Sequence, residues 1–298
     1  MSRTSPIPLW WADLALAFIA LIWGATFVLV KRALDDVSAL LFLALRFTLA
    51  TAALAIAFRG RYGTARAGHK LGFGMIAGLF LFLGYVFQTI GLRHTTASKS
   101  AFITGLSVAM VPLFASLVYK KAPAASEWVG IATATVGMAL LTLPPGQLRI
   151  GLGDSLTAGC AVAFAVHIVA VGHYSPRIGV ESLSLIQVAT AALLGLATFW
   201  WAETPRVKWT LEFMLALAVT ALLATALAFT LQAWAQKHTT ATHTALVFAL
   251  EPVFAWLTSY LVAGETLTGP GVAGAALILG GILMVELKPI RAATHPSG

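Results

Sequence analysis

The chain alternates between long apolar stretches and short polar breaks over nearly its whole length. Each apolar stretch holds about 20 residues, which is the length that a helix needs to cross a hydrocarbon core of about 30 Å. The breaks carry proline, glycine and basic residues, as at Pro144–Pro145–Gly146, and such residues are typical of turns. The membrane-spanning helices predicted from this pattern are 11–30, 38–58, 71–92, 98–119, 126–143, 154–173, 182–201, 211–234, 241–262 and 269–287.

One polar sequence in the breaks occurs twice. Residues 88–98 read QTIGLRHTTAS, and residues 232–242, which lie 144 positions later, read QAWAQKHTTAT. Further matching positions are Pro112 and Pro252, Gly130 and Gly274, and Gly137 and Gly281. A period of about half the chain indicates a duplicated domain rather than a short solenoid repeat.

The duplication predicts an unusual topology. The predicted halves are residues 1–146 and 147–298, and each contains five of the ten predicted helices. Because five is an odd number, the second half enters the membrane in the opposite orientation. The predicted fold is therefore all-α, with ten transmembrane helices as two inverted five-helix repeats. Inverted repeats are typical of secondary transporters, whose substrate site lies near the bilayer midplane between the repeats.

Composition and charge agree with a membrane protein. The chain is 59% hydrophobic and 10% charged, whereas a soluble domain is about 25% charged. A net charge of +8 could indicate a nucleic-acid partner, but the basic residues lie at helix ends, where membrane topology explains them better. With the N-terminus in the cytoplasm, eleven Lys and Arg residues fall in inner segments and seven in outer segments. We therefore expect both termini to be cytoplasmic and no nucleic-acid partner.

Motifs for enzymatic chemistry are missing from the sequence. There is no G-x-S-x-G, H-E-x-x-H, Walker A or Rossmann pattern. The lone cysteine, Cys160, makes a cysteine-based metal site improbable, and we expect no metal, no cofactor and no enzyme activity. Transport without an ATP-binding motif draws on a gradient of substrate or ions. A channel would more naturally show rings of charge or a filter motif, and duplication in one chain favours a self-contained, monomeric carrier.

Several short motifs carry a family resemblance. The first predicted span ends in Trp23–Gly24–Ala25–Thr26–Phe27, the second holds Arg46–Phe47, and the ninth runs Leu250–Glu251–Pro252–Val253–Phe254 toward Gly264–Glu265. With the duplication, these motifs make the chain resemble the drug/metabolite transporter superfamily, and specifically its EamA-type ten-helix exporters, over essentially its whole length. Within that group it is most similar to the bacterial YddG-type exporters of aromatic and other neutral amino acids.

This resemblance implies a function and a location. It implies a multi-pass protein of the bacterial inner membrane, whose partners are the lipid bilayer and a small-molecule substrate. The expected substrate is an aromatic or neutral amino acid, exported by alternating access through a central cavity between the repeats. The alternatives are export of hydrophobic cationic drugs or another small metabolite and, less favoured, a channel.

Polar and aromatic residues deep in the spans are the candidate cavity residues, because a polar group in hydrocarbon needs a partner or water. Gln88 and Gln232 are repeat-related amides that either face the cavity or form bonds between helices, worth about 0.6 kcal/mol on average. Tyr85 and Phe229 lie three residues earlier and share the same helix faces. We place both rings in the cavity wall, with core packing as the alternative.

A second set of candidates comes from the first and sixth spans. Trp23 and Thr26 lie one helical turn apart, and Phe164 and His167 hold the equivalent places in the second half. Aromatic rings at the centre of a bundle suit an apolar or aromatic substrate side chain. His167 is either a structural residue or, because histidine titrates near neutral pH, a participant in proton coupling.

Arg46 and Glu251 are the deepest full charges. Each costs about 2.5–3.5 kcal/mol in isolation on insertion scales, so an ion pair between them would relieve both. Arg46 could instead bind a substrate carboxylate or extend outward to the interface. Glu251 either has a structural role beside Pro252 or serves as the acid for proton coupling.

Other residues have expected structural roles. Asp13 and Asp154 begin their spans and are expected to cap helices, whose N-termini favour anions. The matching glycines Gly130 and Gly274 are expected to face other helices. Pro112 and Pro252 lie at matched places within their spans and are expected to be hinges or static kinks.

Overall fold

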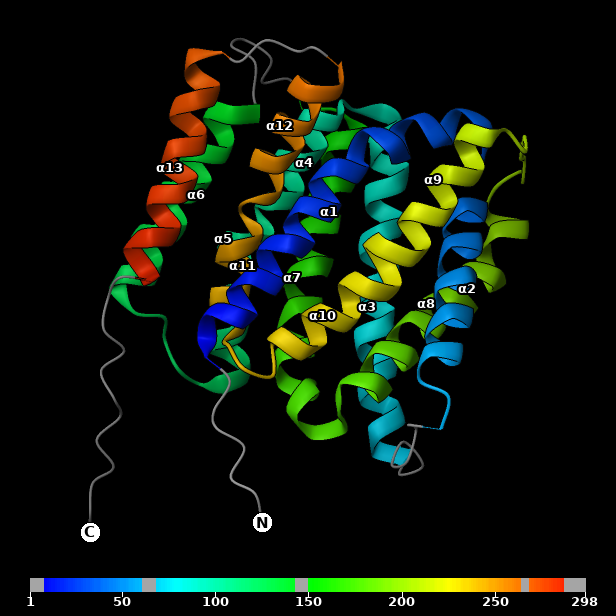
Figure 1. Cartoon of the computed structure of the whole chain (residues 1–298), viewed down its shortest axis with the longest axis horizontal. Helices are drawn as coiled ribbons and strands as arrows, with labels where there is room; N and C mark the ends of the chain where they lie inside the picture. Colours follow the sequence, from blue (N-terminus) through cyan, green and yellow to red (C-terminus); the bar gives the residue numbers. More distant parts are fainter. Residues whose placement is uncertain (1–7, 61–67, 143–149, 264–267, 287–298) are drawn as a thin grey trace.

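A computed structural model describes residues 8–60, 68–142, 150–263 and 268–286. In chain order the helices are α1 (Leu9–Asp36), α2 (Ala39–Ala57), α3 (Gly68–His94), α4 (Ala97–Gly105), α5 (Ser107–Tyr119), α6 (Ala125–Thr142), α7 (Leu152–Ile178), α8 (Val180–Ala202), α9 (Leu211–Ala221), the π-helix η1 (Leu222–Leu227), α10 (Ala228–Ala235), α11 (Ala241–Phe248), α12 (Glu251–Ala263) and α13 (Gly269–Glu286). In these described ranges, β-structure is limited to a single bridge between Val37 and Val207. The elements are shown in Figure 1.

Many of these helices match the predicted spans. Seven segments are long and apolar enough to cross a membrane: α1, α2, residues 71–94 of α3, α4 with α5 from residue 99, α7, α8, and α9 through α10. The predicted all-helical membrane class is therefore confirmed. The remaining predicted spans coincide with α6, with α11 and α12, and with α13. The number ten and the inverted repeat remain predictions, and the expected boundary at residue 146 lies outside the described residues.

The repeated HTTA turn has a clear structural role. Its second threonine, Thr96 in one copy and Thr240 in the other, is the N-cap of the following helix. The Thr96 hydroxyl accepts a hydrogen bond from the backbone N–H of Lys99 at 3.2 Å, and Thr240 accepts one from His243 at 3.1 Å. An N-cap of this kind contributes about 1 kcal/mol to helix stability. Each copy of the motif therefore begins a helix at the edge of the bundle.

Three helical segments are interrupted near their middle. The helix breaks at Leu106, between α4 and α5, and at Ala249–Leu250, between α11 and α12. Both breaks precede a matched proline, Pro112 or Pro252, whose missing N–H leaves a carbonyl on the preceding turn without its usual helical donor. Pro252 is the second residue of α12, whereas Pro112 lies within α5, and their expected role as hinges or static kinks stays a prediction. The third interruption, η1, contains no proline and widens the helix by one π-turn.

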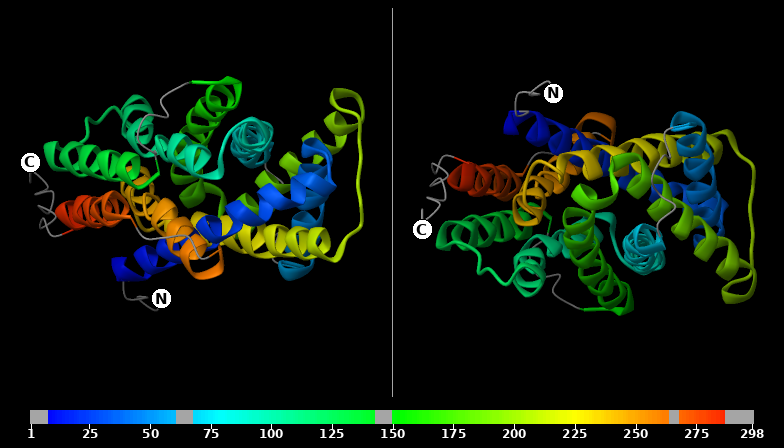
Figure 2. Two further views of the ribbon diagram at one scale, coloured as in Figure 1. Left: turned by 90° about the horizontal axis from the view of Figure 1, so that it is seen from above. Right: turned by 90° about the horizontal axis from the view of Figure 1, so that it is seen from below.

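The glycines at matched positions bring α6 and α13 into close contact. A Cβ atom added to Gly137 would lie 2.6 Å from the carbonyl oxygen of Gly274, and one added to Gly281 would lie 2.6 Å from that of Gly130. The expectation that these glycines face other helices is confirmed, since they face each other. Close backbone approach of this kind stabilises helix pairs in membranes by van der Waals packing. The two helices lie side by side at one edge of the bundle in Figures 1 and 2.

The long helices run roughly parallel, so the bundle has two ends. α1 begins and α13 ends at the lower end in Figure 1, and we call this end the α1-start face. α7 begins at the opposite end, which we call the α7-start face. The exposed, stacked rings of Trp10 and Trp11 belong to the first turn of α1. The exposed Trp200 and Trp201 belong to the last turn of α8, which ends at the α7-start face in Figure 1, and the exposed Trp209 lies in the segment between α8 and α9. Tryptophan is typical of both membrane–water interfaces, so these rings indicate where the bilayer ends.

Candidate functional site

A cavity lies between the helices of the bundle. All nine predicted site residues line it: Trp23, Arg46, Tyr85, Gln88, Phe164, His167, Phe229, Gln232 and Glu251. They come from α1, α2, α3, α7, α10 and α12, and thus from both halves of the chain. The structure therefore brings together residues that lie more than 200 positions apart in sequence.

Aromatic rings form much of the cavity wall. The Trp23 ring centroid lies 5.5 Å from that of Phe229 and 5.0 Å from that of Phe248. The Tyr85 ring meets Phe164 edge-on at 5.2 Å and Phe229 at 6.2 Å. These separations are typical of favourable aromatic pairs. The wall therefore combines these aromatic rings with polar side chains such as Gln88, His167 and Gln232.

Arg46 is buried, with 3% of its surface exposed, and is held by several partners. Its Nε donates to the Thr225 hydroxyl at 2.7 Å, and its Nη2 donates to the Tyr85 hydroxyl at 3.0 Å and to the Ala224 carbonyl at 3.3 Å. Its guanidinium carbon lies 4.4 Å from the centroid of the Tyr85 ring. The expectation that Arg46 extends outward to the interface is wrong.

The π-helix η1 explains why Arg46 takes this position. In η1 the Ala224 carbonyl accepts hydrogen bonds from the Trp23 indole N–H at 2.9 Å and from Arg46 Nη2 at 3.3 Å. The Thr225 hydroxyl accepts from Arg46 while donating to the Thr220 carbonyl at 2.8 Å. Short π-helical turns inside α-helices are frequent at functional sites. Among the described residues, Arg46 and Glu251 form no ion pair, so the predicted pair is wrong.

The two repeat-related glutamines line the cavity and also bond to other side chains. Gln88 Nε2 donates to the Thr104 hydroxyl at 3.3 Å, which links α3 to α4. Gln232 Nε2 donates to Gln236 Oε1 at 2.9 Å, and Gln236 Nε2 donates to the Ile168 carbonyl at 2.9 Å. Each glutamine therefore both lines the cavity and forms a hydrogen bond to another side chain, so the two alternatives offered by the sequence are not exclusive.

His167 is almost fully buried and bonded to a residue that the sequence did not single out. Its Nε2 lies 2.9 Å from Oε1 of Gln187 on α8. Gln187 could have been chosen from the sequence, because it is an amide in an otherwise apolar span and a polar group inside a membrane is costly without a partner. Thr104, Phe248 and Thr225 also contribute to the site, and the last of these depends on η1, which no sequence pattern indicated.

Glu251 occupies the first turn of α12, directly after the helix break, and lines the cavity. A Cβ atom added to Gly24 would lie 2.5 Å from the Glu251 carbonyl oxygen, so glycine lets α1 approach closely here. The side chain is partly exposed within the fold. Within the described part of the chain, its carboxylate has no hydrogen-bond or ion-pair partner.

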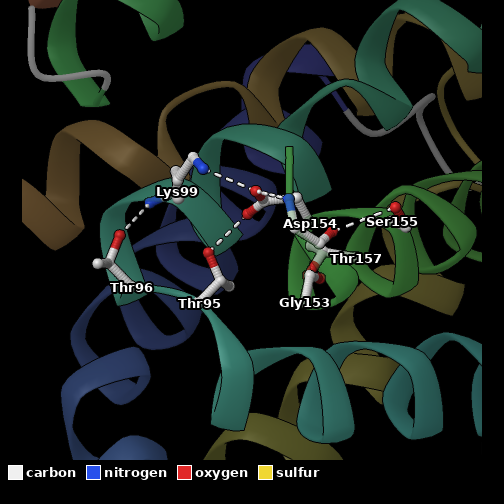
Figure 3. Close-up of polar contacts among 8 residues, drawn as sticks. Thr95, Thr96, Lys99, Gly153, Asp154, Ser155 and Thr157 are labelled. Carbon is white, nitrogen blue, oxygen red and sulfur yellow. Dashed lines mark hydrogen bonds and ion pairs between the residues drawn. The ribbon is translucent and has the colours of Figure 1, made fainter. Parts of the chain in front are cut away.

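An acidic residue at the α7-start face connects two helix starts, as Figure 3 shows. Asp154 Oδ2 accepts from the backbone N–H of Gly151 at 2.9 Å, so the predicted capping role is confirmed for this residue. The same carboxylate accepts from Lys99 Nζ at 2.6 Å and from the Thr95 hydroxyl at 2.6 Å. The Lys99–Asp154 pair is mostly buried and joins α4 to α7.

A second pair, formed by Asp13 and His243, lies at the α1-start face and resembles the Lys99–Asp154 pair. Asp13 is in the second turn of α1, and its Oδ1 lies 2.7 Å from Nε2 of His243 on α11. The predicted capping role is wrong for Asp13, because this carboxylate faces α11 and α1 has no side-chain cap. Lys99 and His243 each lie three residues after a capping threonine, so the two pairs match in the duplicated sequence. They lie at opposite ends of the bundle.

Comparison with known proteins gives consistent results. The family model for the EamA-like transporter family matches residues 10–143 and again residues 151–287. An uncharacterized transporter of Archaeoglobus fulgidus is 36% identical over 278 residues, which cover 93% of this chain and 86% of the relative. The uncharacterized transporter YvbV of Bacillus subtilis is 25% identical and covers 92% of this chain and 91% of its own. A crystal structure that is 22% identical superposes with a TM-score of 0.76 over 93% of this chain and 96% of that chain, which shows likeness of fold alone.

Proposed function

The chain belongs to the EamA-like transporter family, and we propose that it is a secondary transporter that moves a small metabolite by alternating access. The observation that carries this proposal is the central cavity, whose walls hold repeat-related residues from both halves. Secondary transporters bind their substrates at such an interface between repeats.

The proposed architecture has ten membrane crossings in two inverted halves, 1–146 and 147–298. The seven long apolar segments supply seven of these crossings, and α6, α11 with α12, and α13 supply the rest. The separate match of the family model to each half supports the duplication. We further propose a monomer in the bacterial inner membrane with both termini in the cytoplasm.

Alternating access requires that each end of the cavity close in turn. The Lys99–Asp154 pair joins α4 to α7 at one end, and the His243–Asp13 pair joins α11 to α1 at the other. We propose that these pairs are latches, and that each breaks when the cavity opens toward its own face. Their matched positions in the two halves support this assignment, because an inverted repeat places equivalent contacts at opposite faces.

The proposed substrates are neutral amino acids with aromatic or apolar side chains, moved in the direction of export. The aromatic wall suits the substrate side chain, while one cation, Arg46, and one carboxylate, Glu251, suit the two charges of a zwitterion. A hydrophobic cation is the second candidate, because a carboxylate between aromatic rings also suits a positive charge.

Uptake into proteoliposomes of purified protein tests the proposal. Labelled phenylalanine and a labelled hydrophobic cation are each supplied with and without a pH gradient, and protein-free liposomes are the control. We expect saturable uptake of phenylalanine down its own gradient. Uptake of the cation alone would reject the amino-acid substrate while leaving the transporter assignment intact. Saturable transport of neither compound would contradict both proposed substrate classes.

A further inference from the structure

We infer that Glu251 is the main recognition group of the cavity and binds a protonated amine, so the feature a substrate must carry is an amine rather than a carboxylate. This inference rests on the proposed transport function. It goes further by ranking Arg46 and Glu251, the two charged groups of the site, by how much each contributes to substrate recognition.

The first observation is the state of the Glu251 carboxylate. Its side chain is partly exposed and lines the cavity, and it has no partner among the described residues. An ionised carboxylate inside a membrane is costly without a counter-charge or hydrogen bonds. A substrate ammonium would supply both, and charge-assisted hydrogen bonds are about twice as strong as neutral ones. The break before α12 also places this side chain in the first turn of a helix, inside the cavity wall rather than at the membrane surface.

The second observation is that Arg46 is already engaged. Its Nε and Nη2 donate to Thr225, Tyr85 and Ala224, and only 3% of its surface is exposed. A substrate carboxylate would have to reach past these contacts or replace them. Arg46 therefore stabilises the joint between α2, α3 and η1, and contributes less to substrate recognition than Glu251 does.

The third observation concerns the surroundings of Glu251 in the cavity. Trp23 and Phe248 line the same cavity, with ring centroids 5.0 Å apart. Aromatic faces attract ammonium groups, and tryptophan does so most strongly. The cavity therefore combines a carboxylate that lacks a partner with rings that favour a cation. A substrate without an amine would lose both the charge-assisted bond to Glu251 and the attraction to the aromatic rings.

Three probes that differ in one charged group test the inference. Phenylalanine carries an amine and a carboxylate, phenethylamine carries only the amine, and 3-phenylpropionate carries only the carboxylate. Their binding to the purified full-length protein is measured by calorimetry in detergent. The variants are Glu251→Gln, which removes the charge, and Glu251→Asp, which keeps it. Glu212→Gln is the matched control, because Glu212 forms an exposed ion pair with Arg32 away from the cavity.

We expect phenylalanine and phenethylamine to bind the wild type and 3-phenylpropionate to bind weakly or undetectably. Glu251→Gln should weaken both amines roughly 10- to 100-fold, as loss of a hydrogen bond to a charged group does. Glu251→Asp should recover part of that loss, and Glu212→Gln should bind as the wild type does. A thermal unfolding scan confirms that each variant is folded.

Where the wild type binds at least one probe, two results would overturn the inference. One is unchanged binding of the amines by folded Glu251→Gln protein, and the other is binding of 3-phenylpropionate as strong as that of phenylalanine. The same measurements distinguish failure of this inference from failure of the proposed amino-acid substrate. If phenethylamine binds through Glu251 while phenylalanine is neither bound nor transported, the amine inference stands and the amino-acid substrate is rejected. If no probe binds to the wild type, both are rejected.

Discussion

Single residues in this bundle show how a charge can be kept within a membrane. Arg46 gains three hydrogen bonds and an aromatic face, and two of its partners belong to η1. Its planar guanidinium presents up to five N–H donors in a fixed arrangement and can also stack on an aromatic ring. Arg46 therefore joins α2 in the first half to η1 in the second. This contact lies at the cavity, so the stability of the joint and the shape of the site depend on the same atoms.

Thr225→Val should destabilise the protein by about 1–3 kcal/mol, because it leaves Nε of Arg46 buried without an acceptor. Valine has nearly the shape of threonine, so packing changes little. Thr230→Val is the control, since among the residues that the structure describes the Thr230 hydroxyl bonds only to the Ala226 carbonyl of its own helical segment. Thermal unfolding of purified protein compares the two variants. Equal stability of both would show that Arg46 does not depend on Thr225.

At the scale of helices, the hydrophobic pattern predicted most of what the structure contains. It located the apolar segments because a bilayer requires about 20 apolar residues for each crossing. The duplication, rather than the hydrophobic pattern, identified the glycines that face each other across α6 and α13. The hydrophobic pattern did not predict η1, because a π-turn contains no distinctive residue and depends on tertiary partners such as Trp23 and Arg46. The helix break before each proline was expected only as a kink or hinge.

Adjacent glycines in α13 provide a test of the α6–α13 contact. Gly281→Ala should destabilise the protein, because the new Cβ would lie 2.6 Å from the Gly130 carbonyl oxygen. Gly280→Ala should be neutral or stabilising, since nothing lies within 4 Å of its Cβ and alanine favours helix by about 1 kcal/mol. Both are measured by thermal unfolding with a thiol-reactive dye, which reports exposure of the buried Cys160. A higher unfolding temperature for Gly281→Ala would disprove the tight contact.

For the whole molecule, all nine residues that the sequence analysis chose as polar, charged or aromatic positions deep in the spans line one cavity. Sequence reasoning could not identify their partners. Lys99 and His243 were not singled out, since Asp154 lies 55 positions from Lys99 and Asp13 lies 230 positions from His243. Pairs at such separations arise only from the packing of one half against the other. The proposed latches are therefore a property of the assembled bundle and not of either repeat.

The latch proposal predicts opposite effects from equivalent substitutions. Ser107→Cys in a Cys160→Ala background places a thiol in the cavity wall, where a membrane-impermeant reagent can report access from each face of sealed vesicles. Asp154→Asn weakens the Lys99 latch and should raise labelling from the α7-start face, whereas Asp13→Asn should raise it from the α1-start face. We expect increases of roughly 5- to 10-fold, equivalent to about 1 kcal/mol or slightly more per latch.

The controls for this measurement come from the same chain. Glu212→Gln removes a carboxylate from an exposed ion pair and should leave labelling unchanged, because such pairs contribute little. Exchanging the charges with Lys99→Asp and Asp154→Lys together should return labelling toward that of the parent, since the pair re-forms in reverse. Increased labelling from the same face in both single variants would contradict the latch assignment. Opposite effects would mean that the duplicated halves close the two ends of one cavity with equivalent contacts, as alternating access requires.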